Sequence, residues 1–421
     1  MHYRGTVLSA SLTIIVVLPL CGVLAAGHSI EPYLEFPPRT RFVVHESFSW
    51  PVFLILALCI ITLVVPFLCR IAQARMTSDT LRVISSAARA QSEASRFTSD
   101  ASRATLFPWW GWAGLVWTGL AWIVAWNRWE WLGEWQFHTF TPLWLGFIAV
   151  VNALTAGRTG SSLMLRRPGS FLFLFPLSAV FWWTFEYLNR FVQNWYYLGP
   201  REFTAGEYVL LATIPFSTVL PAVISTVEWL STYPQVSVGL ERAWPMPLAA
   251  SRETGWVMVL GAAGGLLGIG LWPDYLFPLV WVAPLFLITG LQLASGGETV
   301  FDSAVRGDWR LLWVAALASL ICGFFWELWN SHSLAHWEYA IPFTHRFQLF
   351  EMPLLGYAGY LPFGLECLAV AQLFITQDWL SLQHESNRKV SPRGHQPDAS
   401  EAVLTFPPVS RQETGCRDLG S

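Results

Sequence analysis

Long uncharged apolar stretches dominate the hydrophobic pattern of this chain. Residues 51–68, 255–272 and 311–325 contain no charged side chain. A helix of about 20 apolar residues crosses a bilayer, so these stretches predict transmembrane helices. Ten spans are expected, near residues 7–26, 50–69, 108–126, 141–157, 171–191, 207–230, 255–272, 276–294, 311–329 and 352–376. The predicted fold is an all-α, polytopic helical membrane bundle of about ten spans.

Composition supports this membrane assignment and excludes several classes of function. Hydrophobic residues make up 54% of the chain and charged residues 13%, more apolar surface than a soluble protein of this length can bury in one core. The sequence contains no Ser-His-Asp or P-loop pattern, and no basic groove for nucleic acid. Its cysteines fall in predicted spans or on the inner side, so disulfides and a zinc or thiol-redox site are not expected.

Arginine placement predicts the orientation of the spans. With the N-terminus inside, the inner segments hold most of the arginines, and the outer segments hold Arg39, Arg41, Arg128, Arg190, Arg201 and Arg346. This asymmetry follows the positive-inside rule, and it predicts an inner (cytoplasmic) membrane protein with both termini cytoplasmic. The first span has an alternative interpretation as a signal peptide, with Arg4 as its charged end and cleavage near residues 23–25. An uncleaved anchor is preferred.

The chain divides into five segments. Residues 1–70 form two N-terminal spans with an outer loop, 71–106 a cytoplasmic heptad-repeat helix, 107–230 and 251–378 two four-helix membrane units, and 379–421 a disordered cytoplasmic tail. Arginine recurs every seven residues within 77–104, and small residues form an a/d seam there. Such a seam predicts a weak coiled coil that assembles copies of the chain or docks a cytoplasmic partner. A solvated or lipid-bound single helix is the alternative.

The second membrane unit repeats chemistry of the first. The matching residues are Glu186, Asn189, Trp195 and Tyr197 with Glu327, Asn330, Trp337 and Tyr339, and Pro215 and Glu228 with Pro353 and Glu366. Each unit has an even number of predicted spans, so both copies share one orientation. The sequence therefore predicts two parallel repeats, which in transporters place binding sites at the repeat interface.

The repeated glutamates are the main candidates for function. A buried carboxylate in a membrane is costly unless it is paired, so Glu186 and Glu327 are predicted to exchange protons with a substrate or to bind a cation. Asn189 and Asn330, three residues further along each helix, are expected to hold these carboxylates in place. The structural alternative is that the glutamates only bridge helices.

Glu228 and Glu366 form a second, deeper pair, which could extend an ion path. Glu228 also lies near the inner interface, where solvent would reach it.

Histidines and tryptophans gather on the predicted outer side. His332 and His336, four residues apart, would share a helix face and suit one metal ion, although the first unit has no matching histidines. An aromatic belt at the headgroups explains the tryptophans most simply. The alternative is an aromatic-lined cavity around Glu186 and Glu327 that stabilises a cationic ligand or carbocation.

Three functions remain open from the sequence. The first is a protein that binds or transforms a membrane lipid or isoprenoid at Glu186 and Glu327. The second is a proton- or cation-coupled transporter, with water-filled routes from Glu186 to Glu228 and from Glu327 to Glu366. The third is a non-catalytic scaffold that oligomerises through 77–104. No cofactor and no nucleic-acid partner is predicted.

Overall fold

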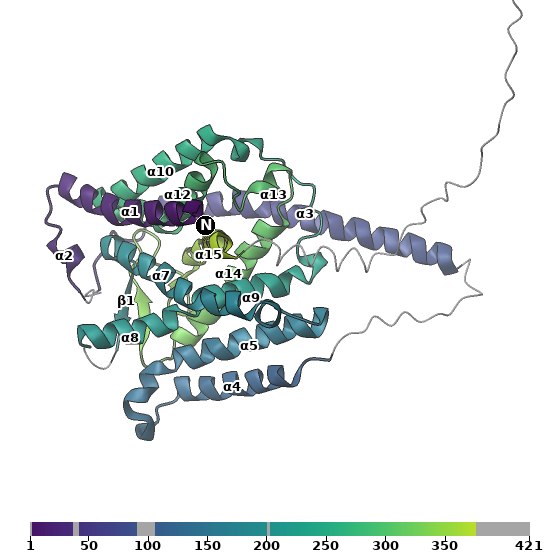
Figure 1. Cartoon of the computed structure of the whole chain (residues 1–421), viewed down its shortest axis with the longest axis horizontal. Coiled ribbons are helices and arrows are strands. Elements are labelled where there is room, and N and C mark those ends of the chain that lie inside the picture. Colours follow the sequence, from purple (N-terminus) through teal and green to yellow (C-terminus); the bar gives the residue numbers. More distant parts are fainter. Residues whose placement is uncertain (1, 37–41, 91–105, 200–202, 376–421) are drawn as a thin grey trace, which may run out of the picture.

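Long apolar helices run side by side through most of the molecule (Figure 1). The computed structural model describes residues 2–36, 42–90, 106–199 and 203–375. Within these residues, eight helices are long and apolar enough to cross a membrane. Pro273–Trp281 and Ala283–Ala294 meet at 54° and make a ninth crossing if they are taken as one broken span. The fold is therefore mostly helical, as expected of a multi-pass membrane protein.

The span count differs from the ten expected. The predicted span near 108–126 does form a helix, Trp109–Trp126, but it is not among the eight or nine. This helix contains six tryptophans. Their indole N–H groups make them more polar than aliphatic residues, which lowers the hydropathy of the segment. The other nine expected spans each coincide with one of the counted helices or with the bent pair.

The N-terminal part contains α1 (His2–Ala25), α2 (Glu31–Leu34) and α3 (Trp50–Ala90). Helix α3 is continuous from the second predicted span into the first half of the predicted heptad helix. The side chains of 79–90 and all of residues 91–105 lie outside the described part, as does the predicted tail 379–421, so the a/d seam remains a prediction. Helix α1 packs on α10 (Arg252–Leu271), where Gly22 approaches Leu267 and Gly270 approaches Pro19 without room for a Cβ.

The first predicted membrane unit contains three long unbroken helices and a fourth span, Ala205–Ser231, which a short turn interrupts. This turn, at residues 217–218, separates α8 (Ala205–Phe216) from α9 (Val219–Ser231). It lies four residues before Pro221, which has no N–H for the Ser217 carbonyl and whose ring would clash with that carbonyl in a continuous helix. The elements are α4 (Trp109–Trp126), η1 (Glu130–His138), α5 (Phe140–Thr159), α6 (Leu163–Arg166), α7 (Pro168–Val192), β1 (Trp195–Leu198), α8 (Ala205–Phe216) and α9 (Val219–Ser231). The 3₁₀ turns η2 (Pro234–Val236) and η3 (Pro247–Ala250) lead to the second unit.

The second predicted unit has a comparable order of elements. They are α10 (Arg252–Leu271), α11 (Pro273–Leu276), η4 (Phe277–Trp281), α12 (Ala283–Ala294), α13 (Asp302–Val305), α14 (Arg310–Asn330), β2 (His336–Tyr339), β3 (Gln348–Leu349), β4 (Met352–Pro353), η5 (Leu354–Gly359) and α15 (Tyr360–Phe374). Helix α4 packs on α5 at one edge of the bundle and α10 on α12 at the opposite edge, with α7, α9, α14 and α15 between them (Figure 1).

Two short strand pairs were not expected from the all-α prediction. Strand β1 pairs antiparallel with β2, and β3 with β4. The segments that form β1 and β2 are rich in aromatic residues, which favour extended backbone. Because β1 follows α7 and β2 follows α14, their pairing joins the ends of two helices that are distant in sequence.

Candidate functional site

The ends of α7 and α14 are built alike, around an asparagine that fixes the following strand. The Asn189 side chain accepts from the backbone N–H of Asn194 at 2.8 Å and of Trp195 at 3.3 Å, and donates to the Trp195 carbonyl at 2.8 Å. Asn330 accepts from the Trp337 N–H at 2.8 Å and donates to its carbonyl at 2.7 Å. Both asparagines therefore hold strands β1 and β2, rather than the glutamate carboxylates as the sequence suggested.

The strand register gathers four aromatic side chains on one face of the ribbon. Trp195 pairs with Tyr339, and Tyr197 pairs with Trp337. Alternate residues of a strand point to the same face, so these four share it. Tyr196 and Glu338, which pair between them, are joined by a hydrogen bond from the tyrosine hydroxyl.

Glu186 accepts hydrogen bonds from this ribbon and from its own helix. Its Oε1 accepts from the indole N–H of Trp182 at 3.0 Å, the indole N–H of Trp195 at 3.2 Å and the hydroxyl of Tyr197 at 2.5 Å. The residue is 2% exposed, and its Oε2 has no hydrogen-bond partner among the described residues.

Glu327 is the counterpart on α14, and it is completely buried. Its Oε1 accepts from the hydroxyls of Tyr339 at 2.6 Å and Tyr360 at 2.7 Å. The Trp337 indole N–H in turn donates to the Tyr339 hydroxyl at 2.8 Å. Within the described part of the chain, Oε2 is again without a partner.

Two tyrosines of the ribbon remain protonated donors at all physiological pH values. Burial, together with the Glu186 carboxylate, raises the pKa of Tyr197 well above its usual value. Burial and the Glu327 carboxylate do the same to the pKa of Tyr339. Both phenols therefore keep the proton that they donate to a glutamate.

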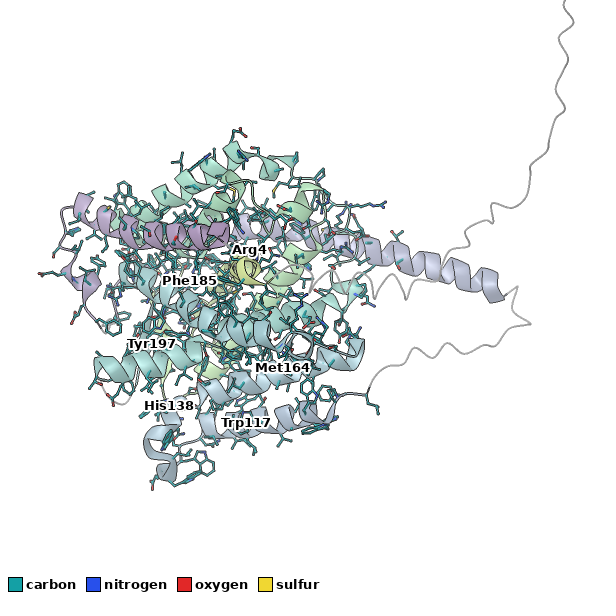
Figure 2. The ribbon with its side chains drawn as sticks, in the orientation of Figure 1. Arg4, Trp117, His138, Met164, Phe185 and Tyr197 are labelled. Atoms are coloured by element: carbon teal, nitrogen blue, oxygen red, sulfur yellow. The ribbon has the colours of Figure 1, made fainter. Side chains whose placement is uncertain are left out.

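The aromatic donors of both glutamates line one cavity of about 890 Å³. Trp182, Trp195 and Tyr197 contribute from the Glu186 side, and Tyr339 and Tyr360 from the Glu327 side. The remaining wall includes Glu35, Phe36, Phe137, His138, Phe140, Phe203, Tyr208, Ala212, Phe216, Trp281, Trp326, His336 and Trp337. Figure 2 places His138 and Tyr197 toward the end of the molecule that carries β1. The glutamates themselves lie behind this wall and are not part of the lining.

The tyrosine roles were missed by sequence reasoning, although a signal existed. Trp195 and Tyr197 recur as Trp337 and Tyr339 at a nearly fixed distance from each glutamate. That recurrence identifies side chains that reach the carboxylates once the strand turns back over the helix. Tyr360, the first residue of α15, has no such signal.

Gly323 provides the space that Tyr360 occupies, which leads to a prediction. A Cβ at this position would lie 2.4 Å from two carbons of the Tyr360 ring. Replacing Gly323 by Ala should therefore displace the ring, break the Tyr360–Glu327 hydrogen bond and lower the melting temperature in detergent. Gly261→Ala, at a position with open space around it, is the control. Equal melting temperatures for the two variants would contradict the prediction.

The second glutamate pair lies outside the cavity lining and differs between its members. Glu228 accepts from the Arg166 guanidinium at 2.6 Å and from the Leu163 N–H at 2.8 Å, so it fixes the turn α6 that precedes α7. Glu366 is completely buried, and neither of its oxygens has a hydrogen-bond partner among the described residues. The cavity reaches neither residue.

The two histidines predicted to bind metal do not share a helix. Helix α14 ends at Asn330, so His332 lies in the following turn and His336 begins β2. The His332 ring bonds to the Ser331 hydroxyl and packs against Trp126, and His336 lies 3.8 Å from Glu338. No group of three or more His, Cys, Asp or Glu side chains able to hold a metal occurs among the described residues.

Comparisons with protein-family models, curated proteins and solved structures gave no match. Function is therefore argued from the geometry of this site.

Proposed function

We propose that this protein is a multi-pass membrane protein that binds a lipid or isoprenoid in the cavity between the Glu186 and Glu327 clusters. The observation that carries the proposal is the cavity itself, whose volume of about 890 Å³ lies in the range of small-molecule sites. Its wall is largely aromatic, with a few polar groups that can orient a ligand. A hydrocarbon tail fits such a wall. The Tyr208 hydroxyl, which has no hydrogen-bond partner among the described residues, and the two histidines offer hydrogen bonds to a headgroup.

In this proposal Glu186 and Glu327 position the wall and do not touch the ligand. Each carboxylate holds aromatic hydroxyl or N–H groups whose rings line the cavity. If the protein also transforms its ligand, protons would pass through a tyrosine hydroxyl. Tyr339 and Tyr360 meet this requirement, since both line the cavity and both donate to Glu327.

We further propose that 107–230 and 251–378 are parallel repeats related by a twofold axis through the β1–β2 ribbon. Support comes from the matching asparagine bonds and from the strand register, because such an axis would exchange the two strands about the Tyr196–Glu338 pair. The packing of α4 on α5 and of α10 on α12 follows the same relation. The cavity, lined by residues of both units, would then lie at the repeat interface.

The orientation is proposed from the charges at the other end of the bundle. Arg70 donates to the carbonyls of Gly239 and Arg242, and Arg75 to that of Gln235, so this end gathers arginines from α3 and from the connection between the units. Placing it in the cytoplasm puts the cavity at the outer leaflet. Labelling of single cysteines from each side of the membrane would test this orientation.

Crosslinking of the full chain would test assembly through 77–104.

Filling the cavity should remove the ligand. Ala212 lines the cavity, whereas Ala113 is exposed on α4 and lies outside it. We expect Ala212→Trp to lose most of the lipid that co-purifies with the wild-type protein, and Ala113→Trp to retain it. Native mass spectrometry of the purified proteins, with lipid extraction, measures this. Equal lipid content in two folded variants would overturn the proposed binding site.

A further inference from the structure

We propose that the cavity recognises its ligand through a cationic headgroup of the quaternary-ammonium type, held by cation–π contacts. This inference rests on the proposed function, because it names the chemistry of the ligand bound there. The size and apolarity of the cavity do not select a headgroup, whereas its aromatic faces and its charges do.

The aromatic wall of the cavity is continuous. The rings of Trp182 and Trp195 lie 6.5 Å apart, and those of Trp195 and Trp281 lie 5.7 Å apart. From Trp182 the wall continues to Trp326 at 6.4 Å, and from there to Tyr360 at 5.9 Å. A cation within about 6 Å of a ring centroid is attracted by its negative face, so neighbouring rings at these spacings can act on one headgroup together.

The polar ends of three wall residues are already hydrogen-bonded to a carboxylate. Trp182, Trp195 and Tyr197 donate their N–H or O–H groups to Glu186. These positive edges are therefore occupied by a carboxylate. What the residues can offer to a ligand is the ring surface, which attracts cations and not anions.

The charges around the cavity also favour a cationic ligand. None of the described lining residues is lysine or arginine, and Glu35 adds a carboxylate. Arg190, one turn beyond Glu186, donates to the carbonyls of Tyr33 and Glu35 and is not part of the lining. Among the described lining residues, the only basic side chains that an anionic headgroup would meet are two histidines. A cationic one would meet aromatic faces backed by Glu186 and Glu327.

The test compares three amphiphiles with the same decyl chain and different heads: trimethylammonium, hydroxyl and sulfate. Each is titrated by calorimetry into the full-length protein in a neutral maltoside detergent, with the alcohol below its solubility limit and the two charged compounds below their micelle concentrations. We expect the trimethylammonium compound to bind about tenfold more tightly than the alcohol, a ratio in the range of cation–π contacts, and the sulfate to bind most weakly.

Variants of one wall residue identify the source of this preference. Trp281→Leu should remove most of the difference between the trimethylammonium and hydroxyl compounds, whereas Trp281→Phe should retain much of it. Trp112→Leu, at an exposed position on α4, is the control and should change neither affinity.

Two outcomes separate this inference from the proposed function. Equal affinities for the three heads would overturn the cationic headgroup and leave lipid binding standing. Absence of binding by all three compounds, in a protein that also purifies without lipid, would overturn both.

Discussion

Replacing Glu186 by Leu should sharply lower the folded yield of this protein. The substitution leaves three donors, Trp182, Trp195 and Tyr197, without their acceptor inside the bundle. An unsatisfied buried donor costs about 1–3 kcal/mol, so the free energy of unfolding should fall by about 3 kcal/mol or more. Size-exclusion chromatography and thermal melting in detergent measure the loss.

Glu186→Gln separates the acceptor role from the charge. The glutamine carbonyl can take the place of Oε1, and its amide replaces an oxygen that has no partner among the described residues. We therefore expect Gln to retain most of the stability that Leu loses, and Glu130→Leu, at an exposed site in η1, to have little effect. If Gln and Leu were equally destabilising, the negative charge, and not the hydrogen-bond geometry, would be what the wall requires.

This distinction bears on which parts of the site the sequence could predict. The sequence alone shows that Glu186 and Asn189 recur as Glu327 and Asn330. Because the same residue types stand three residues apart in both units, they imply matching local chemistry. The hydrogen-bond partners of the two asparagines could not be predicted from the sequence. Asparagine amides bond equally well to carboxylates and to backbone, and only the turn of the chain into β1 and β2 decides between them.

The same limit applies to the fold. Apolar length predicted every helix that is long and apolar enough to cross a membrane among the described residues. The tryptophan-rich helix Trp109–Trp126 was also expected to cross, but its hydropathy is lower than theirs. The prediction of a shared helix face for His332 and His336 failed, because α14 ends at Asn330. At this end Asn330 bonds to the backbone of Trp337 and the chain turns into β2, and helical periodicity does not contain that information.

Replacing each of the two deep glutamates by methionine should change the stability of the protein in opposite directions. Glu366 and Glu228 each follow a proline by thirteen residues, yet Glu366 has no hydrogen-bond partner among the described residues, whereas Glu228 bonds to Arg166 and Leu163. Burial of an unpartnered polar group is costly, so Glu366→Met should raise stability by about 1–3 kcal/mol. Glu228→Met should lower it by about 3 kcal/mol, because it leaves a guanidinium and an N–H unpaired.

The melting temperatures of the two variants, measured in the same detergent, test both expected changes in stability. A gain for Glu366→Met would mean that the protein carries a carboxyl at a cost to its own stability. Such a cost is expected where a buried acid takes up a proton or cation, which is the requirement of the transporter hypothesis. A loss for both variants would contradict this prediction, since Glu366 would then have a bonded partner whose removal is costly. In that case the deep pair would be structural, and the proposed function would depend on Glu186 and Glu327 alone, which hold the wall of the aromatic cavity.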